Sequence, residues 1–159
     1  MTQVQQQTEL SERCSWVEPV YVEGSELDAD EWLKMATILK KASETSPTCH
    51  LATILKNILK RDAQLWALVD KNNFVVGGLV TQILEHKTSY TTLDIVLCAT
   101  EDTNVEWQSM RNVLSRLEEV ALSMDCDAVR IEGRKGWGKM FPDYTQVYCV
   151  FDKVLKRGD

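Results

Sequence analysis

The feature that most constrains the fold is a change of hydrophobic period near residue 64. Before it, apolar residues recur every three or four positions in two segments, as in amphipathic helices that begin near Asp28 and near Thr48. After it, apolar runs of strand length alternate with short polar turns. These runs are residues 64–70, 74–85 and 90–99. Asn72 and Asn73 in the first turn favour a hairpin, because Asn tolerates a left-handed backbone. The sequence therefore predicts two helices followed by an antiparallel meander.

The second half of the chain changes period again. A helical pattern over about residues 105–124 precedes a strand at 127–132, a short helix that contains Trp137, and a last strand at 145–155. The predicted fold class is α/β (α+β), a mixed sheet with an antiparallel meander and helices on both faces. We expect one domain over residues 16–159 and a polar leader over residues 1–15, which shows neither a basic cluster nor an apolar stretch of a secretory signal. Gly77 and Gly78 inside a strand predict a bulge or a close backbone approach.

This order of elements resembles the GNAT (GCN5-related N-acetyltransferase) superfamily over about Trp32 to Leu155. The resemblance is strongest from Leu93 to Leu155, where LDIVLCAT, DAVRIEGRKGW and YTQVYCVFDKVL are similar to a group of phage- and prophage-encoded GNAT-like proteins. That group shares a strand ending in E-x-GR-x-GW and a later Tyr-rich strand. More distantly, the order of elements resembles the internal virion protein A of T7-like podoviruses. The resemblance implies a GNAT-like fold in a phage-encoded protein.

The loop that would hold a cofactor lacks the expected residues. GNAT enzymes hold the pyrophosphate of acetyl-CoA with a Q/R-x-x-G-x-G/A loop after the fourth strand, where backbone N–H groups meet a helix start. At that place this chain has Glu101, Asp102 and Glu106 and no glycine. Carboxylates at a helix start stabilise the helix and repel an anion, and Asp102 or Thr103 suits an N-cap. These residues favour a protein that binds no cofactor.

The candidate site residues follow from the resemblance and from the residue types. Tyr144 and Tyr148 lie where GNAT enzymes often place a general-acid tyrosine, although two amphipathic aromatic residues at a strand start are the more common explanation. Glu85 and Asp94, on neighbouring strands, could act as a general base, or they could be solvent-facing carboxylates. The remaining candidates, for cofactor binding, are Arg111 and Arg134. Arg134 lies in a Gly-Arg-Lys-Gly turn that could receive an anion or could only connect two elements.

Charge and cysteine usage exclude several classes of protein. The net charge of −6 disfavours nucleic-acid binding, which depends on neutralising phosphates. No apolar run is long enough to span a membrane. The five cysteines show no CxxC or CxxH spacing, so reduced thiols in a cytoplasm are expected, and the two histidines have no neighbours at ligand spacing, so no metal site is expected.

These observations predict a non-catalytic phage GNAT-fold protein that acts in protein interaction or virion assembly. Its expected partners are proteins, including other virion or assembly proteins, and neither nucleic acid nor membrane. Its expected location is the host cytoplasm, and incorporation into the virion is a second expected location. The alternative is an acyl-CoA-dependent N-acetyltransferase with a non-standard cofactor site, for which acetyl-CoA is the cofactor.

Overall fold

The computed structural model describes residues 17–44, 50–100, 107–131, 144, 145, 153 and 155. These residues form a mixed five-stranded sheet and the helices that pack on it. The strands are β1 (Glu18–Val22), β2 (Gln64–Val69), β3 (Val75–Glu85), β4 (Thr91–Thr100) and β5 (Ala128–Ile131). The helices are the short 3₁₀ turn η1 (Gly24–Glu26), α2 (Ala29–Ser43), α3 (Leu51–Leu59) and α4 (Trp107–Ser123).

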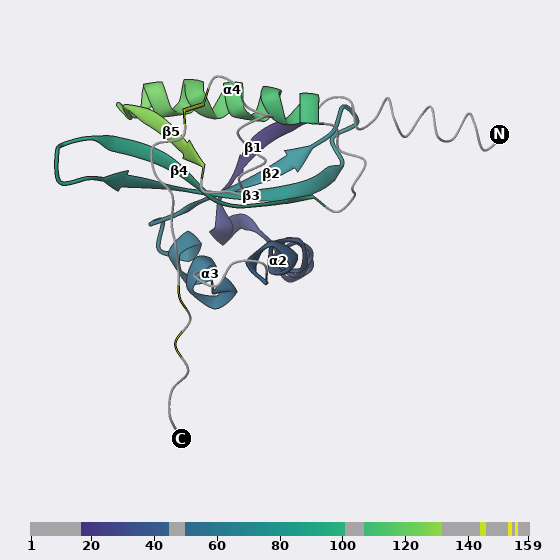
Figure 1. Ribbon diagram of the computed structural model, residues 1–159. Helices are drawn as coiled ribbons and strands as arrows, with labels where there is room; N and C mark the ends of the chain where they lie inside the picture. Colours follow the sequence, from purple (N-terminus) through teal and green to yellow (C-terminus); the bar gives the residue numbers. More distant parts are fainter. Residues whose placement is uncertain are drawn as a thin grey trace.

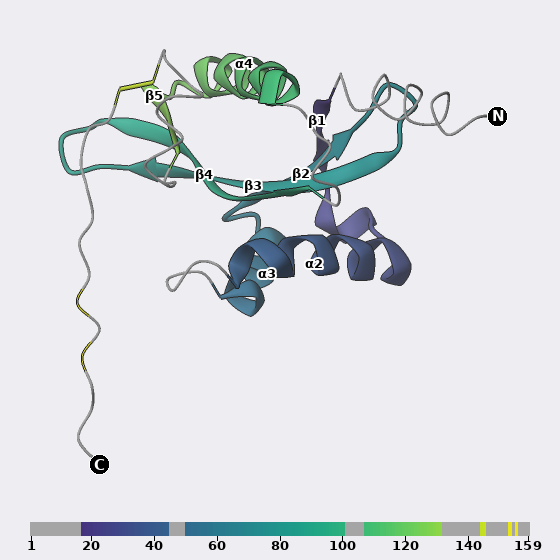
Figure 2. The same ribbon diagram turned by 45° about the vertical axis from the view of Figure 1, so that its right-hand side comes forward.

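The sheet has the strand order β1-β2-β3-β4-β5 (Figure 1). The first four strands pair antiparallel, and β5 pairs parallel to β4. Helix α4 covers one face, whereas α2 and α3 cover the other, as the turned view in Figure 2 shows. The predicted fold class, with its antiparallel meander and helices on both faces, is confirmed.

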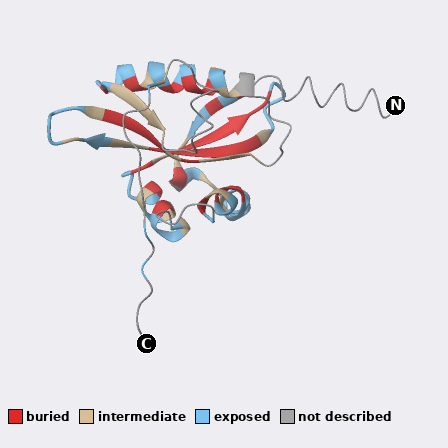
Figure 3. Cartoon of the chain, in the orientation of Figure 1, coloured by how far each residue is buried: buried red, intermediate tan, exposed pale blue. Residues whose placement is uncertain are grey.

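Each face of the sheet has its own apolar core, and buried residues line both (Figure 3). On the α4 face, Leu79 and Leu93 from the sheet pack with Leu117, and all three side chains are at most 1% exposed. On the opposite face, Leu39 of α2 packs with Leu65 of β2. Both faces are therefore buried, which accounts for the nearly continuous apolar runs of the central strands.

Local signals in the sequence explain the element boundaries. Asp28 caps α2: its carboxylate accepts a hydrogen bond from the Glu31 backbone N–H at 2.8 Å, and this bond lowers the pKa of Asp28. Asn73 adopts a left-handed backbone with φ 67° in the turn between β2 and β3, as predicted. The described part of α4 begins at Trp107, and residues 101–106 are outside the described part of the chain.

The predicted close approach at the glycine pair is also confirmed. A Cβ atom at Gly77 would lie 2.5 Å from the backbone oxygen of Ala99, and one at Gly78 would lie 2.7 Å from Sδ of Met35. Gly77 therefore allows β3 to approach β4, while Gly78 allows α2 to approach the sheet. A bulge also occurs beside the pair, because Leu68 pairs with Gly77 but Val69 pairs with Val75.

One strand was not predicted from the sequence, and several predicted segments lie mostly outside the described residues. Strand β1 pairs antiparallel with β2 at the edge of the sheet, a place for which the sequence analysis expected no element. The predicted short helix with Trp137 and nearly all of the predicted strand at 145–155 lie outside the described residues. The leader over residues 1–15 lies outside them too, so the domain boundary stays a prediction.

Candidate active site

A bulge in β4 marks the centre of the candidate site. Val80 of β3 pairs with Leu97, but the next residue, Thr81, pairs with Ile95. Val96 is therefore the extra residue on β4 and has no cross-strand partner on β3. A bulge of this kind interrupts the hydrogen-bond ladder and re-aims the side chains that follow it, which is why bulges are common beside active sites.

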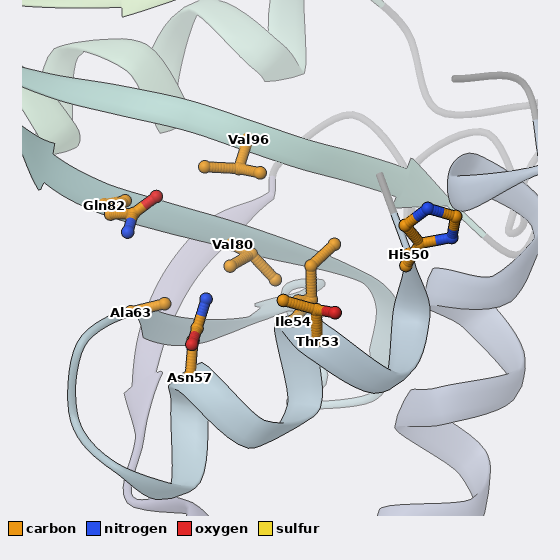
Figure 4. A pocket seen from close by; sticks show the side chains of 8 residues that line it. All are labelled: His50, Thr53, Ile54, Asn57, Ala63, Val80, Gln82 and Val96. Carbon is orange, nitrogen blue, oxygen red and sulfur yellow. The ribbon is translucent and has the colours of Figure 1, made fainter. Parts of the chain in front are cut away.

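A pocket of about 180 Å³ lies beside this bulge, between α3 and the sheet. Figure 4 shows helix side chains on one side of it and strand side chains on the other. The lining residues are His50, Thr53, Ile54, Asn57, Ala63, Val80, Gln82 and Val96. Apolar residues form part of this lining, and the polar remainder consists of amide, hydroxyl and imidazole groups without Lys, Arg, Asp or Glu. Such a lining can orient a small polar group by hydrogen bonds.

Asp94 lies on the same face of β4 as the pocket. Side chains alternate along a strand, and Val96 lines the pocket two residues further on. Asp94 is directly opposite Gln82, another lining residue, in the β3–β4 register. The Asp94 side chain is buried, with 8% exposed. A buried carboxylate requires hydrogen-bond partners, and it is a candidate for proton transfer because it lies close to a pocket.

Polar side chains form a hydrogen-bonded chain that ends at this carboxylate. The hydroxyl of Thr92, which is 0% exposed, donates a hydrogen bond to Oδ1 of Asp94. Nε2 of His86 lies 2.9 Å from the same hydroxyl oxygen and 3.4 Å from Nη1 of Arg130. Arg130 on β5 is also the register partner of Asp94. Asp94 was a candidate from the sequence, whereas His86, Thr92 and Arg130 were not predicted as site residues.

The side of β4 that faces β5 has a described strand partner along only part of its length. Over the described residues, which stop at Ile131 in this strand, β5 pairs with Thr92 to Ile95 of β4. Within the described chain, Leu97, Cys98 and Ala99 of β4 pair with β3, and no described strand pairs with residues 96–99 on the opposite side. Arg111 is exposed in the second turn of α4, which is the first described element after β4. The arrangement leaves backbone amide groups and a cation at the same end of the sheet.

The structure separates the two candidate bases. Glu85 is exposed and has the same strand parity as Ile83, which packs into the core on the α4 face. Asp94 is on the α3 face, so Glu85 and Asp94 do not converge on one site. Among the described residues, the pocket-side carboxylate is Asp94.

The candidate acids are only partly described. Tyr144 packs against the core on the α4 face, and its hydroxyl donates a hydrogen bond of 2.9 Å to Glu118 of α4. It is not brought together with Asp94. Tyr148 and Arg134 lie outside the described residues. The proposed roles of Tyr144, Tyr148, Arg111 and Arg134 therefore stay predictions.

The described cysteines are packing residues, as their spacing predicted. Cys98 of β4 and Cys126 have free thiols. Burial raises the pKa of the Cys98 thiol to about 12. Burial, followed by the nearby carboxylates of Asp127, Asp125 and Asp94, raises the pKa of the Cys126 thiol. Both thiols therefore stay protonated at neutral pH, and this protonation makes them poor nucleophiles.

The described part of the chain shows neither a metal site nor a membrane-spanning helix. No group of three or more His, Cys, Asp or Glu side chains there could hold a metal ion. None of the helices described is long and apolar enough to cross a membrane.

Solved structures share this arrangement of strands and helices. An aminoglycoside acetyltransferase, meta-AAC0020, from an uncultured soil metagenomic sample covers 89% of this chain and 97% of its own, with a TM-score of 0.63 and 14% identity. The chain has a GNAT-like fold. Glucosamine-6-phosphate N-acetyltransferase from Arabidopsis thaliana covers 88% of this GNAT-like chain and 99% of its own, at a TM-score of 0.60 and 11% identity. Ribosomal-protein-alanine N-acetyltransferase from Brucella melitensis biovar Abortus 2308 covers 89% of this chain and 99% of its own, with a TM-score of 0.56 and 13% identity. No protein-family model and no curated protein sequence matches the chain.

These comparisons correct the functional prediction. The structures that share this GNAT-like fold are acetyltransferases, which contradicts the prediction of a non-catalytic assembly protein and favours its enzymatic alternative. The prediction gave too much weight to Glu101, Asp102 and Glu106. Carboxylate side chains can turn toward solvent, whereas the backbone N–H groups of a helix start keep their direction and can still bind an anion. The predicted absence of a cofactor is not supported. The phage origin, the host location and the protein partners stay predictions from the sequence.

Proposed function

We propose that the chain is an acyl-CoA-dependent N-acyltransferase in which Asp94 is the general base. The observation that carries this proposal is the buried carboxylate of Asp94, which lies on the pocket face of β4 beside the bulge at Val96. A carboxylate held there can take a proton from an amine that enters from the pocket. The GNAT-like fold supports the reaction class, because the solved structures that share it are acetyltransferases.

The proposed reaction balances with the groups named. The acceptor amine loses a proton to Asp94, its nitrogen forms a bond with the carbonyl carbon of the thioester, and the carbon–sulfur bond breaks. A general acid then protonates the departing thiolate, and Tyr148 is the candidate, because Tyr144 lies on the α4 face and donates its hydroxyl hydrogen to Glu118. The products are an amide and free CoA thiol. Neither an oxidant nor a metal ion is required.

The residues present fit an acyl-CoA. The pantetheine arm is an extended chain with two amide groups, and residues 96–99 of β4 offer backbone groups on the side away from β3. Arg111, exposed near the start of α4, is the described cation that can pair with a phosphate at this end of the sheet. The thioester supplies the activated acyl group.

The pocket indicates the chemistry of the acceptor. Its charged-residue-free lining and its volume of about 180 Å³ suit the amine-bearing end of a small polar molecule. Asn57 on α3 and Gln82 on β3 offer both hydrogen-bond donors and acceptors (Figure 4). An acceptor with hydroxyl groups next to its amine matches this lining better than an acidic one.

A coupled assay tests the proposed function. The full chain is mixed with acetyl-CoA and a panel of amines that includes an aminoglycoside, an amino sugar, a polyamine and a peptide with N-terminal alanine. Release of free thiol is followed with a thiol-reactive dye, and the acetylated amine is identified by mass spectrometry. The proposal expects thiol release that depends on one of the amines and is lost in D94N. Amine-independent hydrolysis alone, or equal activity in D94N, would contradict it.

A further inference from the structure

The hydrogen-bond chain from His86 through Thr92 to Asp94 contains a constraint on where its protons lie. Thr92 has one hydroxyl hydrogen, and the hydroxyl donates it to Oδ1 of Asp94. The same oxygen lies 2.9 Å from Nε2 of His86. Since the hydroxyl hydrogen is already used, the contact with His86 is a hydrogen bond only if Nε2 carries the proton and donates it. The geometry thus selects the Nε2–H tautomer of the His86 ring whenever Asp94 is ionised.

We propose that His86 is a positioning residue whose Nε2–H group fixes the Thr92 hydroxyl, so that the hydroxyl hydrogen points at the Asp94 carboxylate. This role rests on the proposed function, because it assumes that Asp94 takes the proton of the acceptor amine. His86 follows the last residue of β3 and is half-buried, whereas Thr92 is fully buried. A bond from this ring removes the rotational freedom of the hydroxyl and therefore holds the carboxylate in one orientation.

The backbone around His86 holds the ring in place. The His86 N–H donates to the backbone oxygen of Tyr90 at 2.8 Å, and the Ser89 N–H donates to the backbone oxygen of His86 at 3.0 Å. Ser89 has a left-handed backbone with φ 64°, which closes this turn. The ring of Tyr90 lies 6.2 Å from that of His86, measured between ring centroids. The backbone of His86 is therefore fixed by the hydrogen bonds of its own turn.

The charged and titratable groups around the chain are few among the described residues. Arg130 of β5 faces both His86 and Asp94, with its Nη1 3.4 Å from the His86 Nε2. That contact cannot be a hydrogen bond while Nε2 carries a proton, because both groups are then donors. Cys126 lies near enough to Asp94 for the carboxylate to act on its thiol. Cys126 keeps its proton at neutral pH, because burial and the nearby carboxylates raise the pKa of its thiol.

Nuclear magnetic resonance tests the tautomer without any activity. The chain has two histidines, His50 and His86, so H50Q leaves His86 as the sole imidazole signal. In H50Q at about pH 8, where an ordinary histidine is neutral, long-range ¹H–¹⁵N correlations should show the His86 proton on Nε2. In the same background, T92V should remove that preference and T92S should keep it. An Nδ1–H ring in H50Q would overturn the proposal.

Kinetics test the effect on Asp94 and include a conservative rescue. H86A should lower kcat by roughly tenfold, the loss expected from one hydrogen bond to a charged or catalytic group, with little change in the KM for the amine. H86Q should recover most of that loss, because the glutamine amide can donate to the Thr92 hydroxyl. T92V should lower kcat as much as H86A does. The double variant should lower kcat no further than T92V, since both substitutions interrupt the same hydrogen-bond chain. T92S should resemble the unchanged protein.

The two proposals fail differently. If amines are acetylated but H86A, H86Q and T92V all keep the original kcat, the role of His86 is overturned and the transferase function stands. If no amine is acetylated, the proposed function fails and the catalytic role of His86 fails with it. In that case the resonance of His86 still decides whether its ring donates to Thr92. Thermal unfolding of each variant shows which losses reflect folding.

Discussion

Thr92 and Asp94 lie on the same face of β4, and the buried hydroxyl of Thr92 donates a hydrogen bond to the carboxylate of Asp94. The pair lies next to the bulge at Val96, on the side of the sheet that forms the pocket with α3. Thr92 and Asp94 are thus two polar residues in a largely apolar strand, just before the bulge that interrupts its hydrogen bonds to β3. This relationship connects the fold with the proposed chemistry.

Replacing the base should abolish most of the activity. D94N keeps the size of the side chain but removes its ability to accept a proton, so kcat/KM should fall by about 10²–10⁴-fold, the usual contribution of a general base. E85Q is the matched control, because Glu85 is exposed and lies on the α4 face. Steady-state kinetics with a saturating acyl donor measure both. Equal losses in the two variants would contradict the assignment of Asp94.

Removing the cation on α4 should weaken cofactor binding and leave the chemistry intact. R111A should raise the KM for acetyl-CoA by about tenfold, which corresponds to one hydrogen bond to a charged group. R116A is the charge-matched control on the same helix, since Arg116 instead pairs with Glu119 at 2.8 Å. The effect of R111A should shrink at high salt. An unchanged KM in R111A, or an equal rise in R116A, would show that Arg111 does not contact the cofactor.

A buried hydrogen bond between strands predicts a stability effect. Nε1 of Trp66 donates to Oγ1 of Thr81 at 2.9 Å, and that hydroxyl donates to Gln64 at 2.9 Å. T81V leaves the buried indole N–H without its partner, so the free energy of unfolding should fall by about 1–3 kcal/mol. T81S keeps the hydroxyl and should lose less, about the contribution of one methyl group. Urea unfolding compares the two, and a T81S that is less stable than T81V would contradict this account.

The glycine pair predicts two substitutions of unequal cost. A Cβ at Gly77 meets the backbone oxygen of Ala99, which cannot move without displacing β4, whereas a Cβ at Gly78 meets the flexible side chain of Met35. G77A should therefore destabilise the protein by about 1–3 kcal/mol and G78A by less. Thermal unfolding of both variants measures the difference. Equal destabilisation would mean that the approach of β3 to β4 at Gly77 is not tight.

Burial of the Cys98 thiol predicts a loss of stability in alkaline solution. Its pKa rises from 9.0 to about 12 in the folded protein, so above about pH 9 the unfolded chain releases a proton that the folded protein keeps. The unfolded state then binds fewer protons, and the free energy of unfolding falls with rising pH by up to about 1.4 kcal/mol per unit. C98A should show a shallower fall between about pH 9 and 11. Parallel curves for the two proteins would contradict the prediction.

The sequence predicted those elements whose residues show a clear hydrophobic period. Helices α2 and α4 and the meander are confirmed because their apolar faces pack against the sheet. Strand β1 was missed because it is an edge strand in which Val20 and Tyr21 are nearly half exposed and Pro19 is the buried residue. Such a segment shows no alternation, and its position depends on pairing with β2, which is distant in the sequence.

The candidate site was predicted only in part, for a similar reason. Asp94 stood out as a carboxylate within an apolar strand, but Glu85 carried the same signal, and only the strand register places the two on opposite faces. His86 lies near Asp94 because of the turn between β3 and β4, and Arg130 because β5 pairs parallel to β4. The pattern of residues along the sequence does not reveal either proximity. The paired polar residues at 92 and 94 in one strand are the signal that could have indicated the network.

Calorimetric titration of the full chain with acetyl-CoA tests the central claim most directly. We predict saturable binding of one acetyl-CoA per chain, with a dissociation constant within the micromolar to millimolar range of ordinary enzyme substrates, and a rise in melting temperature at saturation. Binding should weaken in R111A and persist in D94N, because Asp94 acts on the amine. No heat and no thermal shift at roughly millimolar acetyl-CoA would contradict the claim that this GNAT-like chain is an acyl-CoA-dependent transferase.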